Sequence, residues 1–487
     1  MYRPLKGRYV PVTVEKGMNM NQKINEWLDA HQQDLLDDIK SLCRIPSVES
    51  SPKEGMPFGE EPCKALNKAL ELFAGYGFAT HNLENYIGYA DFDPSLPANL
   101  DMLAHSDVVP AGEGWTVTEP FTIIEKDGKL WGRGTSDDKG PMLCAAYAMR
   151  AIRETKTPLT KNVRLIVGSQ EETGTKDIEH YYASQKPAPM TFSPDADFPI
   201  INVELGQFKA AFTRELDAAS AQVKPRVTRL DAGIAINAVP QKAVVAFEGL
   251  ELDMPVVRTA VAQIQEECGV EIHQTGDREL TIIGESAHAS TPQTGRNAGL
   301  AAVLLINRLP LAECQSTALY RKIPELFPYG VTDGSALGIA NEDAESGPLT
   351  ATLDLFRCDE KRLYFKFDAR TPLSSNEENC EKIAQKKLEE AGFTFVSDGM
   401  VPPHAVSADS DFIRTLLSAY EDVTGLKGQC LAIGGGTYVH DVDNGVAFGA
   451  VLPGRDTRMH GADEFFDIDN IMIAAKVYAE AIVRLCG

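Results

Sequence analysis

Three short apolar segments, each followed by histidine or carboxylate side chains, constrain the fold of this chain more than any other feature. The segments are Leu100–Ala104 before His105, Asn162–Val167 before Glu171 and Glu172, and Met190–Phe192 before Asp195. Stretches with helical periodicity, such as Met142–Ile152, lie between them. This alternation predicts an open α/β sheet, in which polar side chains after the strands line a crevice at the strands' carboxyl ends.

The length of 487 residues exceeds what one hydrophobic core usually organises, so we expect more than one domain. From about Gly206 the pattern becomes a mixture of strands and helices, and after about Pro402 it returns to helix–strand–helix. We therefore expect residues 20–205 and 400–487 to form one catalytic domain, interrupted by an inserted α+β lid domain of residues 206–399. Residues 1–19 are expected to be an N-terminal extension.

Two elements near the start of the chain are also predicted from periodicity. Apolar residues from Ile24 to Leu42 recur at helical spacing, which predicts a single amphipathic helix. Thr80–Asp91 has the pattern of a weaker strand.

Composition excludes several classes of function. The 47 Lys and Arg residues against 70 Asp and Glu residues give a net charge of −23, which argues against nucleic acid or anionic lipid as a partner. No apolar run reaches 18 residues, and the first 20 residues lack the apolar stretch of a secretory signal. The nine cysteines occur singly, which is typical of reduced thiols in a cytoplasmic protein.

Candidate chemistry is concentrated in a few short stretches that contain histidine and carboxylates. They are Ala104–Asp107, Gly132–Gly140, Gly168–Gly174, Phe192–Asp197 and Met459–Gly461. Taken singly, each has a plainer explanation, such as a buried structural histidine, a solvated Asp-Asp turn or a surface Glu pair. Taken together, two histidines and several carboxylates without cysteine suit zinc, cobalt or manganese in a hydrolytic site.

The order of these motifs resembles that of the M20 metallopeptidases, and among them the bacterial Xaa-His dipeptidase group. The motifs are H-x-D, G-R-G-x-x-D-D-K-G, E-E, S-P-D and R-x-H-G, and the resemblance extends from about residue 20 to the end. It implies a zinc-peptidase-like catalytic domain, with a mixed sheet flanked by helices and an inserted α+β lid.

The resemblance also implies roles for individual residues. His105 and Asp195 would hold one zinc, Glu172 and His460 the other, and Asp137 would bridge the two. Asp107 would orient His105, and Glu171 would be the general base and acid. The peptide bond between Asp137 and Asp138 is expected to be cis, and Co²⁺ or Mn²⁺ are possible substitutes for the two Zn²⁺ ions.

Three residues of the expected lid, and Gly435 in the second part of the expected catalytic domain, match further family segments. His288 would stabilise the oxyanion, Arg370 would bind the substrate's terminal carboxylate, and Asn237 and Gly435 would contact the substrate. Plainer explanations remain here: Asn237 as a turn residue, Arg370 as an ordinary salt-bridged strand residue, and Gly434–Gly436 as a flexible turn.

These motifs predict a metal-dependent hydrolase of dipeptides. The dispersed cysteines favour a cytoplasmic protein. The long lid resembles the extended family type, in which one chain supplies the whole site, and this resemblance implies a monomer. An alternative with the same metals and base is a deacylase of N-acyl amino acids. Asp195 favours the dipeptidase. In the family that this chain resembles, Asp at this position is typical of dipeptidases and aminopeptidases, whereas Glu is typical of carboxypeptidases and acyl-amino-acid hydrolases. A non-catalytic binding protein is a third possibility, disfavoured because every ligand position and the base are intact.

Overall fold

The computed structural model describes residues 20–487, which divide into two compact units. The first unit contains residues up to Phe198, Arg414–Gly428 and Phe448–Gly487, and the second contains Pro199–Ile413 and Gln429–Ala447. The expected N-terminal extension, residues 1–19, lies outside the described residues. The second unit takes in more of the chain than the expected lid of residues 206–399, whose functional boundaries stay a prediction.

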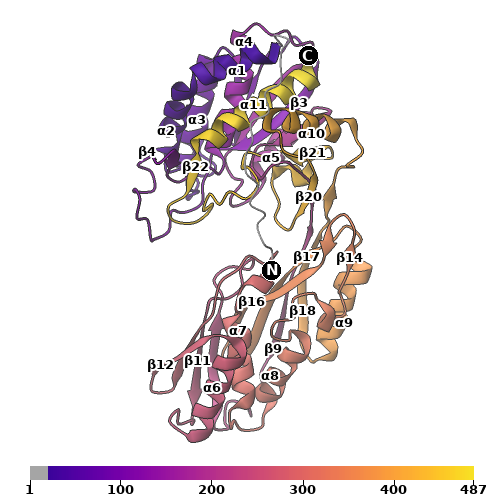
Figure 1. The fold of residues 1–487 in the computed structure, drawn as a ribbon. Coiled ribbons are helices and arrows are strands. Elements are labelled where there is room, and N and C mark those ends of the chain that lie inside the picture. The colour runs from indigo at the N-terminus through magenta and orange to yellow at the C-terminus, as the bar shows by residue number, and fades with distance from the viewer. Residues whose placement is uncertain (1–19) are drawn as a thin grey trace. The chain divides into compact units, whose positions relative to one another are not determined.

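A mixed sheet forms the centre of the first unit, with strands in the order β1-β2-β6-β3-β7 (Figure 1). The strands are β1 (Ala79–Leu83), β2 (Ile87–Asp91), β3 (Ala98–His105), β6 (Asn162–Gly168) and β7 (Met190–Ser193). β3 runs parallel to both β6 and β7, whereas β2 is antiparallel to β1 and β6. Parallel central strands are buried on both faces, which explains their continuous apolar sequences.

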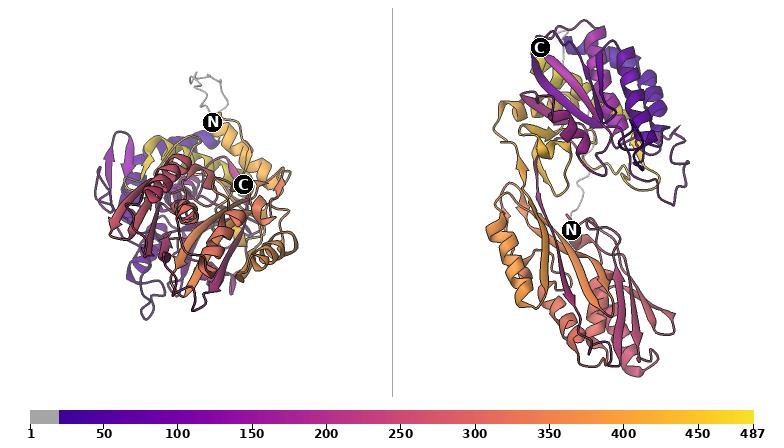
Figure 2. Two further views of the ribbon diagram at one scale, coloured as in Figure 1. Left: turned by 90° about the horizontal axis from the view of Figure 1, so that it is seen from below. Right: turned by 180° about the vertical axis from the view of Figure 1, so that it is seen from behind.

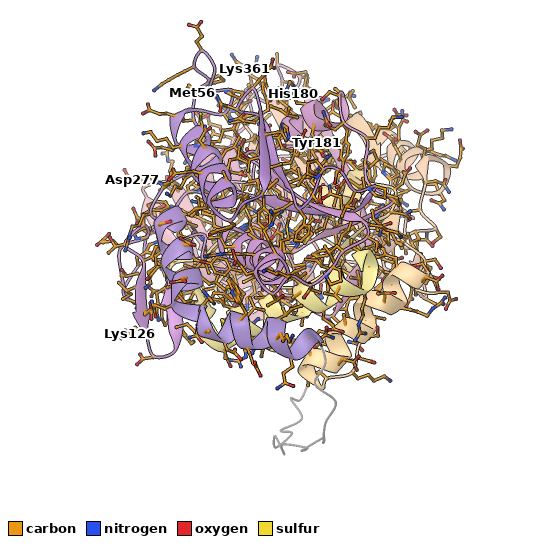
Figure 3. The ribbon with its side chains drawn as sticks, turned by 90° about the horizontal axis from the view of Figure 1, so that it is seen from above. Met56, Lys126, His180, Tyr181, Asp277 and Lys361 are labelled. Carbon is orange, nitrogen blue, oxygen red and sulfur yellow. The ribbon has the colours of Figure 1, made fainter. Side chains whose placement is uncertain are left out.

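Helices cover this sheet and supply most of the remaining core of the first unit. They are α1 (Met20–Ala30), α2 (Gln32–Cys43), α3 (Glu60–Gly75), α4 (Lys139–Glu154), α5 (Lys176–Tyr182), α10 (Asp411–Thr424) and α11 (Ile468–Cys486). α4 and α11 pack against each other and against β3, and α3 packs against β1 and β2. A small sheet joins β4 (Ile124–Lys126), β5 (Lys129–Trp131) and β22 (Phe465–Asp467), with Lys126 exposed at its turn (Figure 3).

Two local predictions were too simple. The predicted helix from Ile24 to Leu42 is divided at His31, whose ring nitrogen Nδ1 lies 2.7 Å from the Trp27 carbonyl oxygen. The apolar spacing continues through both helices and therefore does not reveal the break. The predicted strand Thr80–Asp91 is the hairpin of β1 and β2, because Glu84 and Asn85 both adopt the positive φ of a tight hairpin turn.

The second unit contains an eight-stranded antiparallel sheet in the order β12-β13-β11-β10-β16-β17-β9-β18. Its strands are β9 (Gly206–Glu215), β10 (Arg226–Ala232), β11 (Lys242–Glu248), β12 (Glu271–Gly276), β13 (Glu279–Ile283), β16 (Thr350–Cys358), β17 (Arg362–Thr371) and β18 (Thr394–Val401). Shorter strands of this unit are β8 (Ile200–Glu204), β14 (Glu342–Asp343), β15 (Gly347–Pro348), β19 (His404–Ala405), β20 (Cys430–Ile433) and β21 (Gly445–Ala447).

Four helices lie along the eight-stranded sheet (Figure 2), and their buried side chains share one hydrophobic core with it. They are α6 (Pro255–Cys268), α7 (Ala298–Arg308), α8 (Gln315–Leu326) and α9 (Lys382–Glu390). Side chains alternate along β17, so that Phe365 and Phe367 enter this core while Asp368 and Arg370 do not. The alternation places Asp368 and Arg370 together on one face of the strand.

The mixed sheet with flanking helices and the separate strand-and-helix unit confirm the expected α/β fold class. All nine cysteines are free thiols. Among the helices of residues 20–487, none combines the length and the apolar character that crossing a membrane requires.

Candidate active site

The candidate site lies in the first unit, where the parallel strands β3, β6 and β7 end at one edge of the sheet. His105 is the last residue of β3, Glu171 and Glu172 follow β6, and Asp195 follows β7. Because parallel strands present their carboxyl ends at the same edge, residues far apart in the sequence meet there. Asp137 arrives from the turn before α4, and His460 arrives from the loop before β22.

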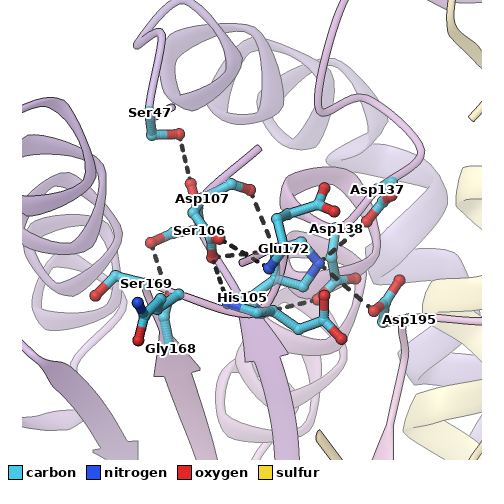
Figure 4. A network of polar contacts seen from close by, with 12 residues as sticks. Ser47, His105, Ser106, Asp107, Asp137, Asp138, Gly168, Ser169, Glu172 and Asp195 are labelled. Atoms are coloured by element: carbon cyan, nitrogen blue, oxygen red, sulfur yellow. Dashed lines mark hydrogen bonds and ion pairs between the residues drawn. The ribbon is translucent and has the colours of Figure 1, made fainter. Parts of the chain in front are cut away.

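His105 is the fully buried centre of this group (Figure 4). Its Nε2 atom lies 3.0 Å from Oδ1 of Asp137 and 3.5 Å from Oδ2 of Asp195. On the other side of the ring, Nδ1 lies 3.4 Å from Oδ1 of Asp107. One imidazole nitrogen therefore faces the candidate ligands while the other is oriented by a carboxylate, which is the usual arrangement of a metal-ligating histidine.

Asp137 lies between the two histidines. Its Oδ1 atom faces His105, and its Oδ2 atom lies 2.9 Å from Nε2 of His460, which is also 3.1 Å from Oε2 of Glu172. Two sets of potential ligand atoms each lie within 4.8 Å of one another: His105 with Glu171 and Asp195, and His105 with Asp137 and Glu172. The two oxygens of Asp137 therefore face different histidines, so that each oxygen is available to a separate set of potential ligand atoms.

Asp107 connects the glutamate pair to His105. Its Oδ1 and Oδ2 atoms accept hydrogen bonds from the backbone amides of Glu171 and Glu172, at 3.2 and 3.1 Å. The same carboxylate faces Nδ1 of His105. Asp107 therefore fixes the position of both glutamates relative to the histidine, which is more than the orientation of His105 that the sequence predicted.

The carboxylates are held where negative charge is costly. Withdrawal from water raises the pKa of Glu171 well above its ordinary value, with Asp195 and Glu172 adding to the effect. Burial and the neighbouring Asp137 raise the pKa of Glu172 to about 7. Burial also raises the pKa of Asp195. Groups with such raised pKa values in one cluster are typical of a functional site.

The pKa values of the two histidines are also raised, whereas the pKa of Asp137 is lowered. Hydrogen bonds to Asp137 and Glu172 raise the pKa of His460 to about 11. Hydrogen bonds to Asp107, Asp137 and Asp195 outweigh burial and raise the pKa of His105. Although burial alone would raise the pKa of Asp137, its hydrogen bonds to both histidines lower it. Each histidine is drawn toward its charged form by an excess of carboxylate.

This donor set fits divalent cations. Four carboxylates, Asp137, Glu171, Glu172 and Asp195, meet two imidazoles, so negative charge exceeds what two protonated histidines would neutralise. Buried charge of one sign is strongly unfavourable without compensation. Oxygen and imidazole donors without thiolate suit zinc, cobalt or manganese.

The turn before α4 contains features that fix His105 and His460. The peptide bond between Asp137 and Asp138 is cis, as the family resemblance implied. The buried Asp138 accepts a hydrogen bond from the amide of His105 at 3.0 Å. Arg133 donates to Glu464 at 2.6 Å and to the carbonyl of Gly461 at 3.2 Å, which joins this turn to the loop of His460.

The roles of Asp138, Arg133 and Glu464 were missed from the sequence. Arg133 and Glu464 are separated by 331 residues, and no local pattern pairs them. Only the H-G-x-x-E spacing from His460 to Glu464 could have drawn attention to the second carboxylate.

The predicted lid residues all lie in the second unit, and the structure brings their segments together. Ala238 and His288 form an isolated β-bridge, and the amide of Ala289 donates to the carbonyl of Asn237 at 2.9 Å. Thr350, which is paired with Arg370 in the sheet, donates its hydroxyl to the carbonyl of Ala289. Asn237, His288 and Arg370 therefore belong to one connected group.

Arg370 is anchored before any substrate arrives. Its Nε and Nη2 atoms donate to the two oxygens of Asp368 at 2.9 and 2.8 Å, and Nη1 donates to the carbonyl of Gly434 at 2.5 Å. The salt-bridged strand arginine of the plainer explanation is thus present. A guanidinium has five N–H groups, however, and these bonds use three of them, which leaves two.

The glycine loop that contains Gly435 is anchored by a buried glutamate. Glu204 accepts hydrogen bonds from the amide and hydroxyl of Thr437, and its Oε2 atom lies 3.0 Å from Nδ1 of His440. His440, which the sequence left without a role, therefore holds the loop through Glu204. The plainer explanation of this segment as a flexible turn does not fit these hydrogen bonds.

Comparison with known proteins identifies the family. The sequence pattern of peptidase family M20/M25/M40 matches residues 102–484. The chain is an M20-family metallopeptidase. This match confirms the family inferred from the motifs.

Relatives of this M20 peptidase align over nearly its whole length. YtjP of Bacillus subtilis (strain 168) is 34% identical over 466 residues, which cover 93% of this chain and 97% of YtjP. The Beta-Ala-Xaa dipeptidase of Lactobacillus delbrueckii subsp. lactis is 32% identical over 476 residues, covering 96% of this chain and 99% of that protein.

Solved structures with the same fold are more distant in sequence. Human carnosine dipeptidase 1 has a TM-score of 0.57 at 15% identity, covering 96% of this chain and 99% of that one. Aminoacylhistidine dipeptidase from Vibrio alginolyticus has a TM-score of 0.56 at 13% identity, covering 93% of this chain and 96% of that one. At these identities the likeness establishes the fold.

Proposed function

We propose that this M20 peptidase hydrolyses the peptide bond of dipeptides with two zinc ions, for which Co²⁺ or Mn²⁺ can substitute. His105 and Asp195 would hold one ion, Glu172 and His460 would hold the other, and Asp137 would contact both. The position of Asp137, with its two oxygens on different histidines, is the observation that carries the proposal. Identity of 32% to a Beta-Ala-Xaa dipeptidase over nearly the full length supports the substrate class.

The chain's own groups have distinct tasks in this proposal. When bound, the two metal ions supply Lewis acidity that lowers the pKa of a water molecule toward neutrality. Glu171 accepts the proton of the attacking water and returns it to the leaving amine nitrogen. Burial raises the pKa of Glu171, which is the direction expected for a carboxylate that takes up a proton during the reaction. Asp107 holds Glu171 in place through the backbone amide.

The second unit supplies the groups that recognise the rest of the substrate. His288 donates a hydrogen bond to the oxyanion that forms from the scissile carbonyl. Arg370 binds the terminal carboxylate with the two N–H groups that Asp368 and Gly434 leave available, a planar geometry that Lys cannot reproduce. Asn237 and the backbone at Gly435 complete the contacts. Recognition of both the reacting bond and the terminus limits the substrate length.

The proposal is tested with the full-length protein, stripped of metal by a chelator and assayed before and after addition of zinc, cobalt or manganese. The substrates are a mixed panel of dipeptides, N-acetyl amino acids and one tripeptide. Metal-restored cleavage confined to dipeptides is the expected result. Cleavage confined to N-acetyl amino acids would assign the protein to the deacylases, and no cleavage with any metal would overturn a hydrolytic function.

We also infer a monomer in a reducing, cytoplasmic compartment. The expected lid of residues 206–399 resembles the extended type in which one chain supplies every site residue, and all nine cysteines are free thiols. Sedimentation of the metal-loaded protein at several concentrations tests the oligomeric state, and a constant monomer mass is expected.

A further inference from the structure

Two groups of Ser290 lie within hydrogen-bond distance of the same nitrogen of the His288 imidazole. Its Nδ1 atom lies 2.7 Å from the hydroxyl of Ser290, and the backbone amide of Ser290 donates to Nδ1 at 3.2 Å. An amide N–H can only donate, so Nδ1 must act as an acceptor. The hydroxyl of Ser290 can donate or accept, and it completes the arrangement only by donating as well.

These contacts determine the protonation state of the ring. In a neutral imidazole one nitrogen is a donor and the other an acceptor, so an accepting Nδ1 requires the proton to be on Nε2. The opposite tautomer would direct an N–H group at the amide hydrogen of Ser290. An imidazolium would do the same. The local structure therefore selects the neutral form in which Nε2 is the donor.

Ser290 is itself held in place by the glycine loop of the same unit. A Cβ atom added at Gly434 would lie only 2.3 Å from Cβ of Ser290, so the backbone at Gly434 approaches as closely as a glycine permits. Thr291 donates its amide to the carbonyl of His288 at 2.9 Å, which closes the turn that contains Ser290. These two contacts hold the backbone and Cβ of Ser290 beside the ring of His288.

We propose that Ser290 is a positioning residue that keeps His288 in the neutral tautomer with its proton on Nε2. The inference rests on the proposed function in one respect, because the oxyanion of the substrate is the acceptor for the Nε2 proton there. The tautomer itself is independent of any substrate. Ser290 thus prepares the donor before binding, so that no proton has to move within the ring during the reaction.

The decisive measurement is the nitrogen NMR spectrum of the metal-loaded, full-length protein with labelled histidine, without substrate. The chain has nine histidines, and the signals absent from His288→Gln identify those of His288. We expect a bare Nδ1 and a protonated Nε2 in the native protein. In Ser290→Ala the fraction of the other tautomer should rise about fivefold, which corresponds to the loss of one typical hydrogen bond.

Two further variants serve as a graded substitution and as a control for this measurement. Ser290→Cys keeps the connectivity of the side chain but offers a weaker donor, so it should give an intermediate tautomer fraction. Ser286→Ala removes an exposed serine from the same loop and should leave the spectrum of His288 unchanged. A native protein with its proton on Nδ1, or an unchanged tautomer in both Ser290 variants, would overturn the proposal.

Kinetics separate this inference from the proposed function. Ser290→Ala should lower kcat for a dipeptide only in proportion to the molecules that leave the Nε2-protonated tautomer, which is less than about twofold while that tautomer stays the major one, and KM should change little. If the tautomer shifts as expected and His288→Gln still hydrolyses dipeptides at the native rate, the oxyanion role of His288 is wrong while the role of Ser290 stands.

Discussion

The ion pair between Arg133 and Glu464 lies beside the loop of His460, because Arg133 also donates to the carbonyl of Gly461. Glu464→Gln tests how much this pair contributes to stability and to metal binding. One oxygen of Glu464 accepts the 2.6 Å bond from Arg133, and the other accepts the amide and hydroxyl of Ser136 at 3.0 and 3.1 Å. Both charged side chains are buried, with 1% and 0% of their surface exposed. The substitution keeps the shape of the side chain and removes its charge.

The expected cost follows from this burial. Removing one partner of a buried ion pair usually costs about 3–5 kcal/mol, because the other charge is left in a poorly solvated position. Gln can still accept the bonds from Ser136, so we expect the lower end, about 3 kcal/mol. The matched control is Asp422→Asn. Asp422 pairs with Arg484 and has 67% of its side chain exposed, so this substitution should lower the free energy of unfolding by less than about 1 kcal/mol.

Denaturation with urea measures both losses. The three tryptophans, Trp27, Trp115 and Trp131, all lie in the first unit, so their fluorescence reports the unfolding of the unit that contains Glu464. The free energies of unfolding of the two metal-free variants are compared with that of the metal-free native protein. Metal is omitted because binding to the folded state would add its own stabilisation.

The same substitution should weaken one metal position more than the other. Arg133 also donates to the carbonyl of Gly461, next to His460, so loss of Glu464 frees the arginine to move that loop. Partners of metal ligands typically contribute about 10–100-fold to affinity. Competition with a coloured chelator should show about tenfold weaker binding of one ion per chain and little change in the other. Equal stability losses in Glu464→Gln and Asp422→Asn, or equal weakening of both ions, would refute this reasoning.

Three other predictions test separate parts of the molecule. Glu171→Gln should lower kcat about 10²–10⁴-fold while metal analysis shows both ions retained, and native activity with both ions bound would exclude Glu171 as the base. Burial raises the pKa of Asp101 to about 6, so the folded state holds this proton more tightly than the unfolded state, and the free energy of unfolding should fall as pH rises from about 4 to 6. Asp101→Asn, whose side-chain oxygen can still accept the amide of Ala188, should remove about 2–3 kcal/mol of that pH dependence in urea titrations. An unchanged pH profile would contradict this assignment. Arg370→Lys loses the planar pair with Asp368 and should raise KM about tenfold for dipeptides but not for dipeptide amides, whereas equal effects on both would argue against a carboxylate contact.

Much of the fold was accessible from local patterns. Apolar segments that end in His105, Glu172 and Asp195 predicted parallel strands with the site at their carboxyl ends, and β3, β6 and β7 have this arrangement. The prediction succeeded because strand burial and strand ends leave a signal within a few residues. The break at His31 left no such signal, since the apolar period continues across it.

The support around the site was not accessible in this way. Glu464 lies beside Arg133, and Glu204 lies beside Thr437, only because distant segments pack together. A carboxylate in the sequence looks the same whether it is solvated or buried against a guanidinium. The physical difference between the two cases is desolvation, which depends on all the surrounding chain.

The sequence by itself determined the kinds of chemistry that this protein can perform. The order of its histidines and carboxylates identified the M20 family, and the absence of paired cysteines required a metal site of oxygen and nitrogen donors. Tertiary structure decided how those groups are prepared: Asp137 between two histidines, and His288 with a defined tautomer through Ser290. Residue types follow from the sequence, but the direction of each hydrogen bond depends on packing, because only a fixed neighbour can select one orientation of a side chain.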